Sequence, residues 1–280
     1  MSVPAVPGEG AERTRRTSGV ARSKRPRGGA RKPTLRLERE LLRSGVVMLA
    51  AADEVGRGAL CGPATVGVVV VTEQTRSAPR GVRDSKLLTA AAREELVAPV
   101  QQWAHAWAVG HAGPDEVDQW GIIAALRVAG HRALAQLPDP PDAVLLDGNY
   151  DYLTPPEPPE PPEAQRSEQA SLFAEFEPGQ DAGPELAWAA AFGSGGFPAV
   201  HTRVKADMVC AAVAAASILA KTARDRIMVE LAADYPEYGW QSNKGYAAAD
   251  HCEALCRLGP TPHHRRSWRL PGAVAAAVGD

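Results

Sequence analysis

The chain has 280 residues, of which 45% are hydrophobic and 23% charged, so it is long enough for one large globular domain. Its net charge of −2 excludes no class of partner, because the charge is segregated along the chain. Residues 1–35 carry nine Lys or Arg against two Glu, whereas residues 151–199 carry nine Asp or Glu against one Arg.

The four cysteines bear on whether the protein has a zinc site, and the absence of long apolar stretches bears on its cellular location. Only "HCEALC", with Cys252 and Cys256, resembles a metal site, and a zinc site needs about four ligands from two such clusters. Free thiols are therefore the better interpretation. We find no secretory or transmembrane segment, so we expect a cytoplasmic protein with no membrane partner.

Residues 1–40 are rich in Arg, Gly, Pro and Ser and show almost no apolar periodicity. Such a segment cannot bury enough apolar surface to offset its ordering entropy, which predicts a basic disordered tail. Two interpretations stay open for it. The tail is either an electrostatic tether for nucleic acid or a solvated segment without a specific role.

The next elements alternate between strands and helices. Apolar runs predict strands over 46–52 and 64–71, close enough in sequence to pair antiparallel. Helical spacing follows over 89–103, with Thr89 as the N-cap. The remaining elements are a strand near 103–110, a helix over 121–137, strands over 142–147 and 199–204, a long Ala-rich helix from about 207, and a helix over 248–258. This order predicts an α/β fold.

Residues 154–198 interrupt the pattern. The stretch "TPPEPPEPP" has six prolines in nine residues, which favours extended polyproline II and forbids helix. A loop of this length within a compact domain is usually functional or disordered. We therefore predict one folded domain over 41–272, interrupted by this acidic insertion and followed by a short tail over 273–280.

Four acids stand where strands end or a helix begins: Asp53, Glu54, Asp147 and Asp207. Neighbouring strand residues point to opposite faces, so the first two reach one centre only if the strand ends there, as Gly56 and Gly58 would allow. Carboxylates brought together repel unless cations neutralise them, and oxygen ligands alone suit Mg²⁺ or Mn²⁺. The alternative for each acid is a solvated cap, with Asp207 as an N-cap.

The local contexts of these acids form a set. "DEVGRGALCGP", "RDSKLL", "LLDGN", "KADMVCAAVAAASILAKTARDRIM", "YPEYGWQSNKGY" and "HCEALCRLGPTPHHRRSW" occur in this order. The set resembles ribonuclease HII (type 2 ribonuclease H), over about residues 46–269 apart from the insertion. The resemblance implies an RNase H-like mixed five-stranded sheet flanked by helices, with a helical C-terminal part.

The same resemblance implies an activity. Asp53, Glu54, Asp147 and Asp207 would be the catalytic, metal-binding acids, with two Mn²⁺ or Mg²⁺ ions and Asp53 as the bridge between them. The substrate would be a ribonucleotide embedded in duplex DNA, or an RNA–DNA hybrid, as in ribonucleotide removal during repair or replication. The endonuclease would cut on the 5′ side of the ribonucleotide and leave a 5′-phosphate. We expect it to act as a monomer.

Several other residues are candidates for substrate contact. Glycines without a Cβ let the backbone of Gly56-Arg57-Gly58 approach a 2′-hydroxyl, which is the group that separates RNA from DNA. The family resemblance places Tyr246 on the sugar at the RNA–DNA junction. The further candidates for phosphate contact or for ordering the site are Ser85, Lys86, Asn149 and Lys221 with Arg224.

Structural alternatives exist for Lys221 and for two further arginines, and the sequence departs from the family at one position beside the fourth acid. Lys221 lies four residues before Asp225 on one helix, so an intrahelical ion pair is an equal interpretation. Arg265 and Arg266 either fix phosphates or close the fold. Ala206 departs from the family, which commonly has Gly before the fourth acid.

The insertion contains "QASLF", residues 169–173. This pentapeptide resembles the peptide by which bacterial replication and repair proteins dock on the sliding clamp, with Gln169 as a hydrogen-bonding anchor and Leu172 and Phe173 as apolar anchors. A short docked helix or chance similarity are the alternatives. Two other functions therefore stay open: a catalytically silent, clamp-tethered DNA-binding adaptor, and a hybrid nuclease indifferent to the junction.

Overall fold

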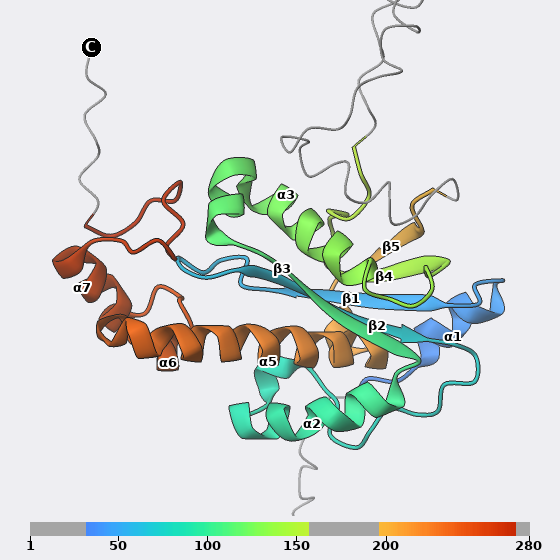
Figure 1. Ribbon diagram of the computed structural model, residues 1–280. Coiled ribbons are helices and arrows are strands. Elements are labelled where there is room, and N and C mark those ends of the chain that lie inside the picture. Colours follow the sequence, from blue (N-terminus) through green and yellow to red (C-terminus); the bar gives the residue numbers. More distant parts are fainter. Residues whose placement is uncertain (1–31, 157–195, 273–280) are drawn as a thin grey trace, which may run out of the picture. The chain divides into compact units, whose positions relative to one another are not determined.

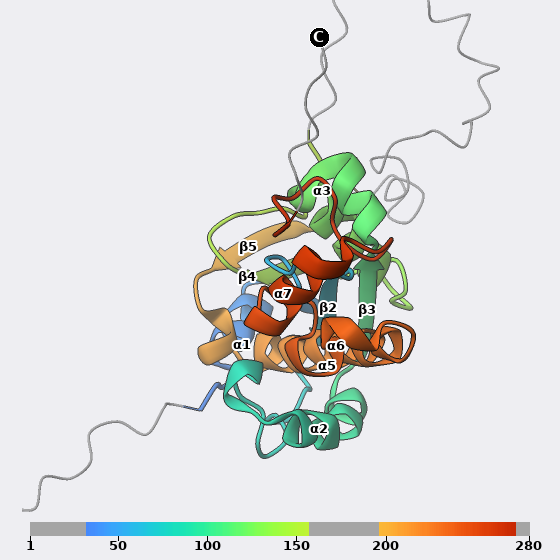
Figure 2. The ribbon, with the colours of Figure 1, turned by 90° about the vertical axis from the view of Figure 1, so that its left-hand side faces the viewer.

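The computed structural model of the chain describes residues 32–156 and 196–272, shown as coloured ribbon in Figures 1 and 2. Residues 1–31, 157–195 and 273–280 lie outside the described part. The candidate clamp residues Gln169, Leu172 and Phe173 therefore fall outside it as well.

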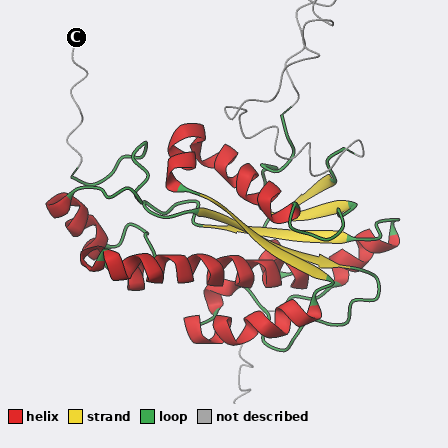
Figure 3. Cartoon of the chain, in the orientation of Figure 1, coloured by secondary structure: helices red, strands yellow, loops and turns green. Residues whose placement is uncertain are grey.

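One mixed sheet forms the centre of the described fold (Figure 3). Its order is β3-β2-β1-β4-β5, with β1–β2 and β2–β3 antiparallel and β1–β4 and β4–β5 parallel. This confirms the predicted five-stranded mixed sheet and the antiparallel first pair. The strands are β1 (Leu49–Val55), β2 (Ala64–Val71), β3 (Ala106–Ala112), β4 (Ala143–Asp147) and β5 (Ala199–Arg203).

Helices cover both faces of this sheet (Figure 1). Alternate residues of β1 belong to two cores: Leu49 and Ala51 pack with α5, whereas Ala50 and Ala52 pack with α3. α2 lies beyond α5, and α6 and α7 form the C-terminal part around a third apolar cluster. The helices are α1 (Arg36–Arg43), α2 (Ala90–Trp103), α3 (Pro114–Leu134), α5 (Ala211–Asp234), α6 (Trp240–Asn243) and α7 (Ala249–Leu258).

The Ala-rich sequence of α5 serves close packing on the sheet. Gly67 in β2 has no Cβ, and one built there would lie only 2.5 Å from the carbonyl oxygen of Ala216. Small residues on both sides therefore let the helix axis approach the central strands, which brings the start of α5 near β1 and β4.

Element boundaries differ from the prediction at three places. β1 starts at Leu49 and continues through both acids to Val55, while β2 occupies the predicted residues. The helix expected from 121 already begins at Pro114, and its geometry breaks at Gly121, where φ is +78°. α5 begins at Ala211, after a 3-10 turn, η4 (Ala206–Met208). Asp207 lies in that turn, so its interpretation as the helix N-cap is wrong.

The predicted tail over 1–40 is wrong at its C-terminal end, where α1 forms. Thr34 exchanges backbone hydrogen bonds with Val209 and Ala211, at the segment that follows Asp207. Leu42 is buried, and the buried Glu38 accepts a hydrogen bond from the Ala212 N–H at 2.9 Å. α1 thus holds the start of α5. The helix is amphipathic, with Leu37, Leu41 and Leu42 at helical spacing, but this short pattern lies at the end of an Arg-rich segment whose composition favoured disorder.

Glu38→Gln is expected to remove a pH dependence of stability. Burial raises the pKa of Glu38 to about 7. The folded state then binds the proton more tightly than the unfolded chain, so the free energy of unfolding falls as pH rises from about 4.5 to about 7. The upper bound of this loss is on the order of 3 kcal/mol. Urea unfolding of the wild type and of Glu38→Gln, carried out from about pH 4.5 to pH 8, measures this change in the free energy of unfolding.

The exposed Glu40 on the same helix provides the matched control, Glu40→Gln. An equal pH slope in wild type and Glu38→Gln would contradict a titrating Glu38.

Candidate active site

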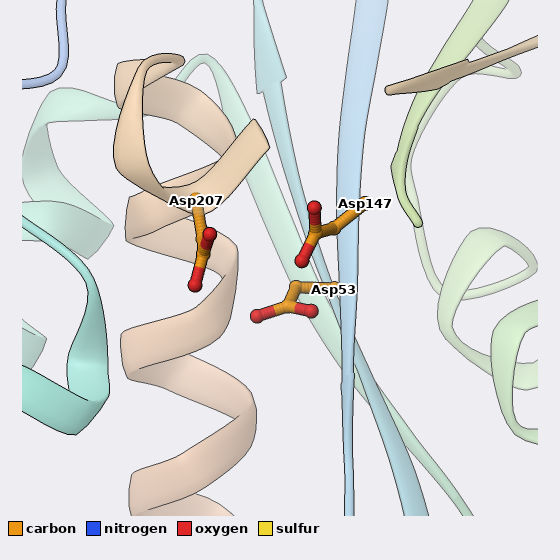
Figure 4. Close-up of side chains that lie close together, drawn as sticks. All are labelled: Asp53, Asp147 and Asp207. Atoms are coloured by element: carbon orange, nitrogen blue, oxygen red, sulfur yellow. The ribbon is translucent and has the colours of Figure 1, made fainter. Parts of the chain in front are cut away.

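Three aspartates from separate segments meet on one face of the sheet (Figure 4). Asp53 comes from β1, Asp147 from the end of β4, and Asp207 from η4. One carboxylate oxygen from each lies within 4.8 Å of the others. They converge because β1 and β4 are neighbouring parallel strands, and because η4 leads into the helix that packs across β1.

The group fits a hard divalent cation. Burial, as the largest cause, and the charges of Glu54, Asp147 and Asp207 together raise the pKa of Asp53 to about 8, against a hydrogen bond from Ser217 that lowers it. A desolvated carboxylate among like charges therefore holds a proton until a cation replaces it. Within the described ranges, the group contains carboxylates only, without His or Cys, which is the donor set of Mg²⁺ or Mn²⁺.

Two contacts hold the other aspartates in place. The Ala206 N–H donates to Asp147 Oδ1 at 2.7 Å. Because the donor is a backbone N–H, alanine at position 206 can make this contact as well as the glycine that is common in the family. Lys86 Nζ lies 3.6 Å from Asp207 Oδ2. Burial and the charges of Asp147 and Asp84 raise the pKa of Asp207, and Lys86 opposes that rise. Asp53 and Asp207 are buried, which excludes the solvated-cap interpretation for both.

Glu54 lies apart from this group. Because the strand runs on to Val55, Glu54 points to the opposite face from Asp53. Its carboxylate accepts a hydrogen bond from the Tyr152 hydroxyl at 3.4 Å and lies 3.8 Å from an Arg57 nitrogen. The strand does end directly before Gly56, as expected, but it continues past both acids and so does not bring Glu54 to the aspartate group here. A metal-binding role of Glu54 stays a prediction.

The Gly-Arg-Gly turn and Tyr246 form one unit, although they lie far apart in sequence. The Gly56 N–H donates to the Tyr246 hydroxyl oxygen at 3.2 Å. Gly56 has φ +86°, and a Cβ there would lie 2.6 Å from the Pro63 carbonyl oxygen, so only glycine fits. Arg57 and Gly58 are exposed beside this contact. We call these residues, 56–58 and Tyr246, the turn–tyrosine unit.

Two buried arginines support the turn–tyrosine unit from below. Arg224 donates to the carbonyls of Cys61, Pro63 and Lys244, each at 2.9 Å, and its guanidinium lies 5.3 Å from the Tyr246 ring centre. Arg265 is fully buried and donates to the carbonyls of Gly62 and Arg57. Their contacts with backbone show that both arginines close the fold. For Arg266, only a backbone contact to Asp118 is present among the described residues.

The remaining predicted residues divide by exposure. Ser85 is buried, with its Oγ 2.8 Å from the Oγ of Ser217, and so orders the site beneath Asp53. Lys221 pairs with Asp225 at 2.6 Å, which confirms the intrahelical ion pair. Asn149 is exposed just after Asp147, and Lys86 has a side chain that is 74% exposed. These two are free to meet a substrate.

A chain of buried histidines positions Tyr246 and was not predicted. Thr261 N–H donates to His264 Nδ1, so His264 Nε2–H donates to His251 Nε2 at 3.0 Å. Trp240 donates to the same His251 atom, which leaves His251 Nδ1–H to donate to the Tyr246 carbonyl at 2.8 Å. Burial lowers the pKa of His264 to about 4, consistent with neutral rings. Ser217, the one hydroxyl within the apolar first part of α5 (residues 211–220), was also not predicted, although the sequence carries a signal for it.

Two further findings concern the state of the cysteines and the length and polarity of the helices. All four cysteines, two of them buried, are free thiols. Over residues 32–156 and 196–272, none of the helices combines the length and the apolar character that a membrane span requires.

A mixed sheet of this order, with an aspartate group on its central strands, defines an RNase H-like nuclease. The sequence model of the family described as Ribonuclease HII matches residues 50–171 and 191–270. The chain therefore belongs to the ribonuclease HII family and is a ribonuclease H.

Relatives in two bacterial groups agree. The chain is 41% identical to a Ribonuclease HII of Streptomyces coelicolor over 243 residues, 86% of each chain. It is 38% identical to a Ribonuclease HII of Cereibacter sphaeroides over 232 residues, 83% of this chain and 89% of the relative.

Solved structures share the fold. The crystal structure of ribonuclease H2 from Pyrococcus horikoshii OT3 has a TM-score of 0.53 and 26% identity, and the match covers 80% of this chain and 94% of that one. Bst-RNase HIII in complex with Mn²⁺ has a TM-score of 0.53 at 20% identity, over 83% and 70% of the two chains. The RNase HII in the PCNA complex from Archaeoglobus fulgidus has a TM-score of 0.52 at 24% identity, over 79% and 93%. The last two likenesses concern the fold alone.

Proposed function

We propose that this ribonuclease H is an endonuclease that cuts the phosphodiester 5′ of a ribonucleotide in duplex DNA or in an RNA–DNA hybrid. The observation that carries the proposal is the aspartate group, with its oxygens within 4.8 Å of one another, on the same fold as the turn–tyrosine unit. The enzyme would act in the cytoplasm as a monomer and serve ribonucleotide removal in DNA repair or replication.

Asp53, Asp147 and Asp207 would hold Mn²⁺ or Mg²⁺, with Glu54 joining when substrate binds. When bound, a pair of such ions supplies an activated water and stabilises the leaving oxygen of an in-line displacement at phosphorus. When a cation binds, Asp53 would release the proton that its raised pKa retains, and so gain the negative charge that helps to hold the cation. Lys86 would offset charge beside Asp207 and approach a phosphate oxygen.

The turn–tyrosine unit would test the sugar. Backbone groups of residues 56–58 can approach a 2′-hydroxyl closely, and Arg57 is exposed to meet a phosphate. The hydrogen bond from Gly56 and the Arg224 guanidinium beneath the ring fix the orientation of Tyr246. A ring fixed in this way would favour a deoxyribose after the ribonucleotide, because an added 2′-hydroxyl would crowd it.

Tyr246→Ala is expected to remove the preference for the junction, whereas Tyr246→Phe keeps most of it. Stacking of a base or sugar on an aromatic ring contributes about 1–3 kcal/mol, or roughly tenfold to a hundredfold in kcat/KM. The measurement compares one ribonucleotide with a run of ribonucleotides in the same duplex, with Mg²⁺ and with Mn²⁺.

Wild-type enzyme that cuts both duplexes equally would favour the hybrid nuclease indifferent to the junction. Complete absence of cutting by the wild type would favour the catalytically silent adaptor.

A sliding clamp stays a candidate partner through residues 169–173. Gln169→Ala with Phe173→Ala is expected to abolish binding to a purified bacterial clamp, because both the hydrogen-bonding and the apolar anchors are lost. Incision of free duplex should be unchanged, since neither residue belongs to the aspartate group. Surface plasmon resonance on immobilised clamp measures the first effect, and unchanged affinity would refute the assignment.

A further inference from the structure

A basic cleft lies between α1 and the loop over 77–82, apart from the aspartate group. Its volume is about 920 Å³. Five cationic side chains and one acid account for the charged part of its lining: Lys32, Arg36, Arg39, Arg43, Arg80 and Glu40. We propose that this basic cleft binds backbone phosphates of the duplex on the 5′ side of the cut bond. The inference rests on the proposed function and extends its binding surface.

The arrangement of α1 presents these charges to solvent. Arg36, Arg39 and Arg43 are spaced three and four residues apart and so share one face of the helix. The opposite face is anchored by the buried Glu38 and Leu42. The ion pairs found within the described ranges involve none of the five cations of the basic cleft. Their charge is therefore available to an external anion.

The basic cleft connects to the aspartate group through two short segments. Ala211, four residues after Asp207, lines it on one side, and Val82, four residues before Lys86, lines it on the other. Four residues span at most about 14 Å. Lys86 lies next to Asp207, so cationic side chains continue from the aspartates to α1. A duplex phosphate at roughly four base steps from the cut bond would fall within this reach.

The basic cleft and the turn–tyrosine unit lie toward opposite ends of α5. Arg224, which supports Tyr246, lies about 20 Å along the helix from Ala211 at a rise of 1.5 Å per residue. Figure 1 shows the same order, with α1 beyond the start of α5 and α7 beyond its end. If the turn–tyrosine unit reads the ribonucleotide on the 3′ side of the cut bond, the basic cleft meets the DNA on the 5′ side.

The lining chemistry points to phosphates and away from bases. Guanidinium groups bind phosphate oxygens in pairs of hydrogen bonds. Among the described residues, the lining contains no aromatic side chain on which a base could stack. Contacts of this kind position a duplex without reading its sequence, as a repair nuclease requires.

The test uses the full-length chain and a duplex with a single ribonucleotide. Arg36→Gln with Arg80→Gln removes one charge from each side of the basic cleft. Without divalent metal, the dissociation constant at moderate salt should rise roughly tenfold, and the slope of log K against log salt should shrink by about 0.9 per lost phosphate contact. KM should rise by a similar factor with kcat unchanged, because the cleft does not touch the reacting atoms. Circular dichroism checks that the double variant, Arg36→Gln with Arg80→Gln, folds like the wild type.

Two comparisons locate the effect. Arg80→Gln is matched by Arg76→Gln, an exposed arginine of the same loop that does not line the cleft, and only the former should weaken binding. A duplex trimmed to about two base pairs on the 5′ side removes phosphates within the cleft's reach, so wild type and double variant should then bind alike. A duplex trimmed on the 3′ side should preserve their difference.

Equal affinities and salt slopes of wild type and double variant on the long duplex would overturn the inference, whether or not the enzyme cuts. A defect that persists on the 5′-trimmed duplex would overturn the assigned side. A wild-type protein that binds through the basic cleft but does not cut would refute the proposed function alone.

Discussion

Asp53→Asn is expected to abolish incision of a ribonucleotide-containing duplex and to stabilise the metal-free protein at the same time. Asp53 is buried among the other acids, and chiefly for that reason its pKa is raised to about 8. A neutral amide cannot supply the negative charge that would hold a divalent cation here, so several kcal/mol of transition-state stabilisation would be lost. That corresponds to at least about a thousandfold in rate at about 1.4 kcal/mol per factor of ten.

The stability change follows from proton linkage. The folded pKa of Asp53 is about 8, above the ordinary 3.8, so the wild-type chain loses stability as pH rises between these values. Asn does not titrate, and at pH 8 without metal the variant should be more stable by up to roughly 5 kcal/mol. Mn²⁺ should reverse the order, because only the wild type gains stability from tight metal binding.

Thermal melts with EDTA and with Mn²⁺, together with single-turnover incision, measure both effects. Asp139→Asn, an exposed loop residue, is the control and should change neither. A variant that cuts at the wild-type rate would refute the role of Asp53.

Arg224→Met is expected to cost the fold on the order of 4 kcal/mol. The side chain is fully buried, and its three hydrogen bonds satisfy carbonyls from two separate loops. Met fills much of the volume but leaves these acceptors without donors, at about 1–3 kcal/mol for each one that water does not reach. Tyr246 loses its cationic support as well, so junction preference should fall along with stability.

Urea unfolding gives the first quantity, and incision of the two duplexes described above gives the second. Arg226→Met provides the control, because Arg226 sits two residues further along the same helix, is exposed and pairs with Glu94. Arg224→Lys keeps the charge with fewer donor directions, and should fall between wild type and Met. A stability loss below about 1 kcal/mol would contradict a supporting role of Arg224.

The sequence predicted the elements whose signals are local. The run of β-branched residues in β2 placed that strand at its observed residues, and Thr89 caps α2 as predicted. The Ala-rich β1 gave a weaker signal and was placed three residues early. α1 was missed although Leu37, Leu41 and Leu42 stand at helical spacing, because eight residues give a short signal beside a long Arg-, Gly- and Pro-rich segment, and its burial against other segments is not local.

In the candidate active site, too, the residues with a local sequence signal could be predicted and those that depend on distant contacts could not. Asp53, Asp147 and Asp207 were each identified from their neighbours in sequence, and the structure brings them together. The separation of Glu54 depended on where β1 ends, and boundaries are the least local property of a strand. The histidine chain beneath Tyr246 depended on contacts between α7 and the segment after it, and on the tautomer that each contact selects.

The hydrogen bond between Gly56 and Tyr246 joins positions 190 residues apart, and this separation orders events during synthesis. All three aspartates emerge from the ribosome before Tyr246 does. A chain that stops short of α6 would therefore hold the three aspartates but lack the turn–tyrosine unit. If that unit reads the junction as proposed, junction preference would depend on the C-terminal part folding back to close this long loop, and truncation from the C-terminal side would remove that preference first.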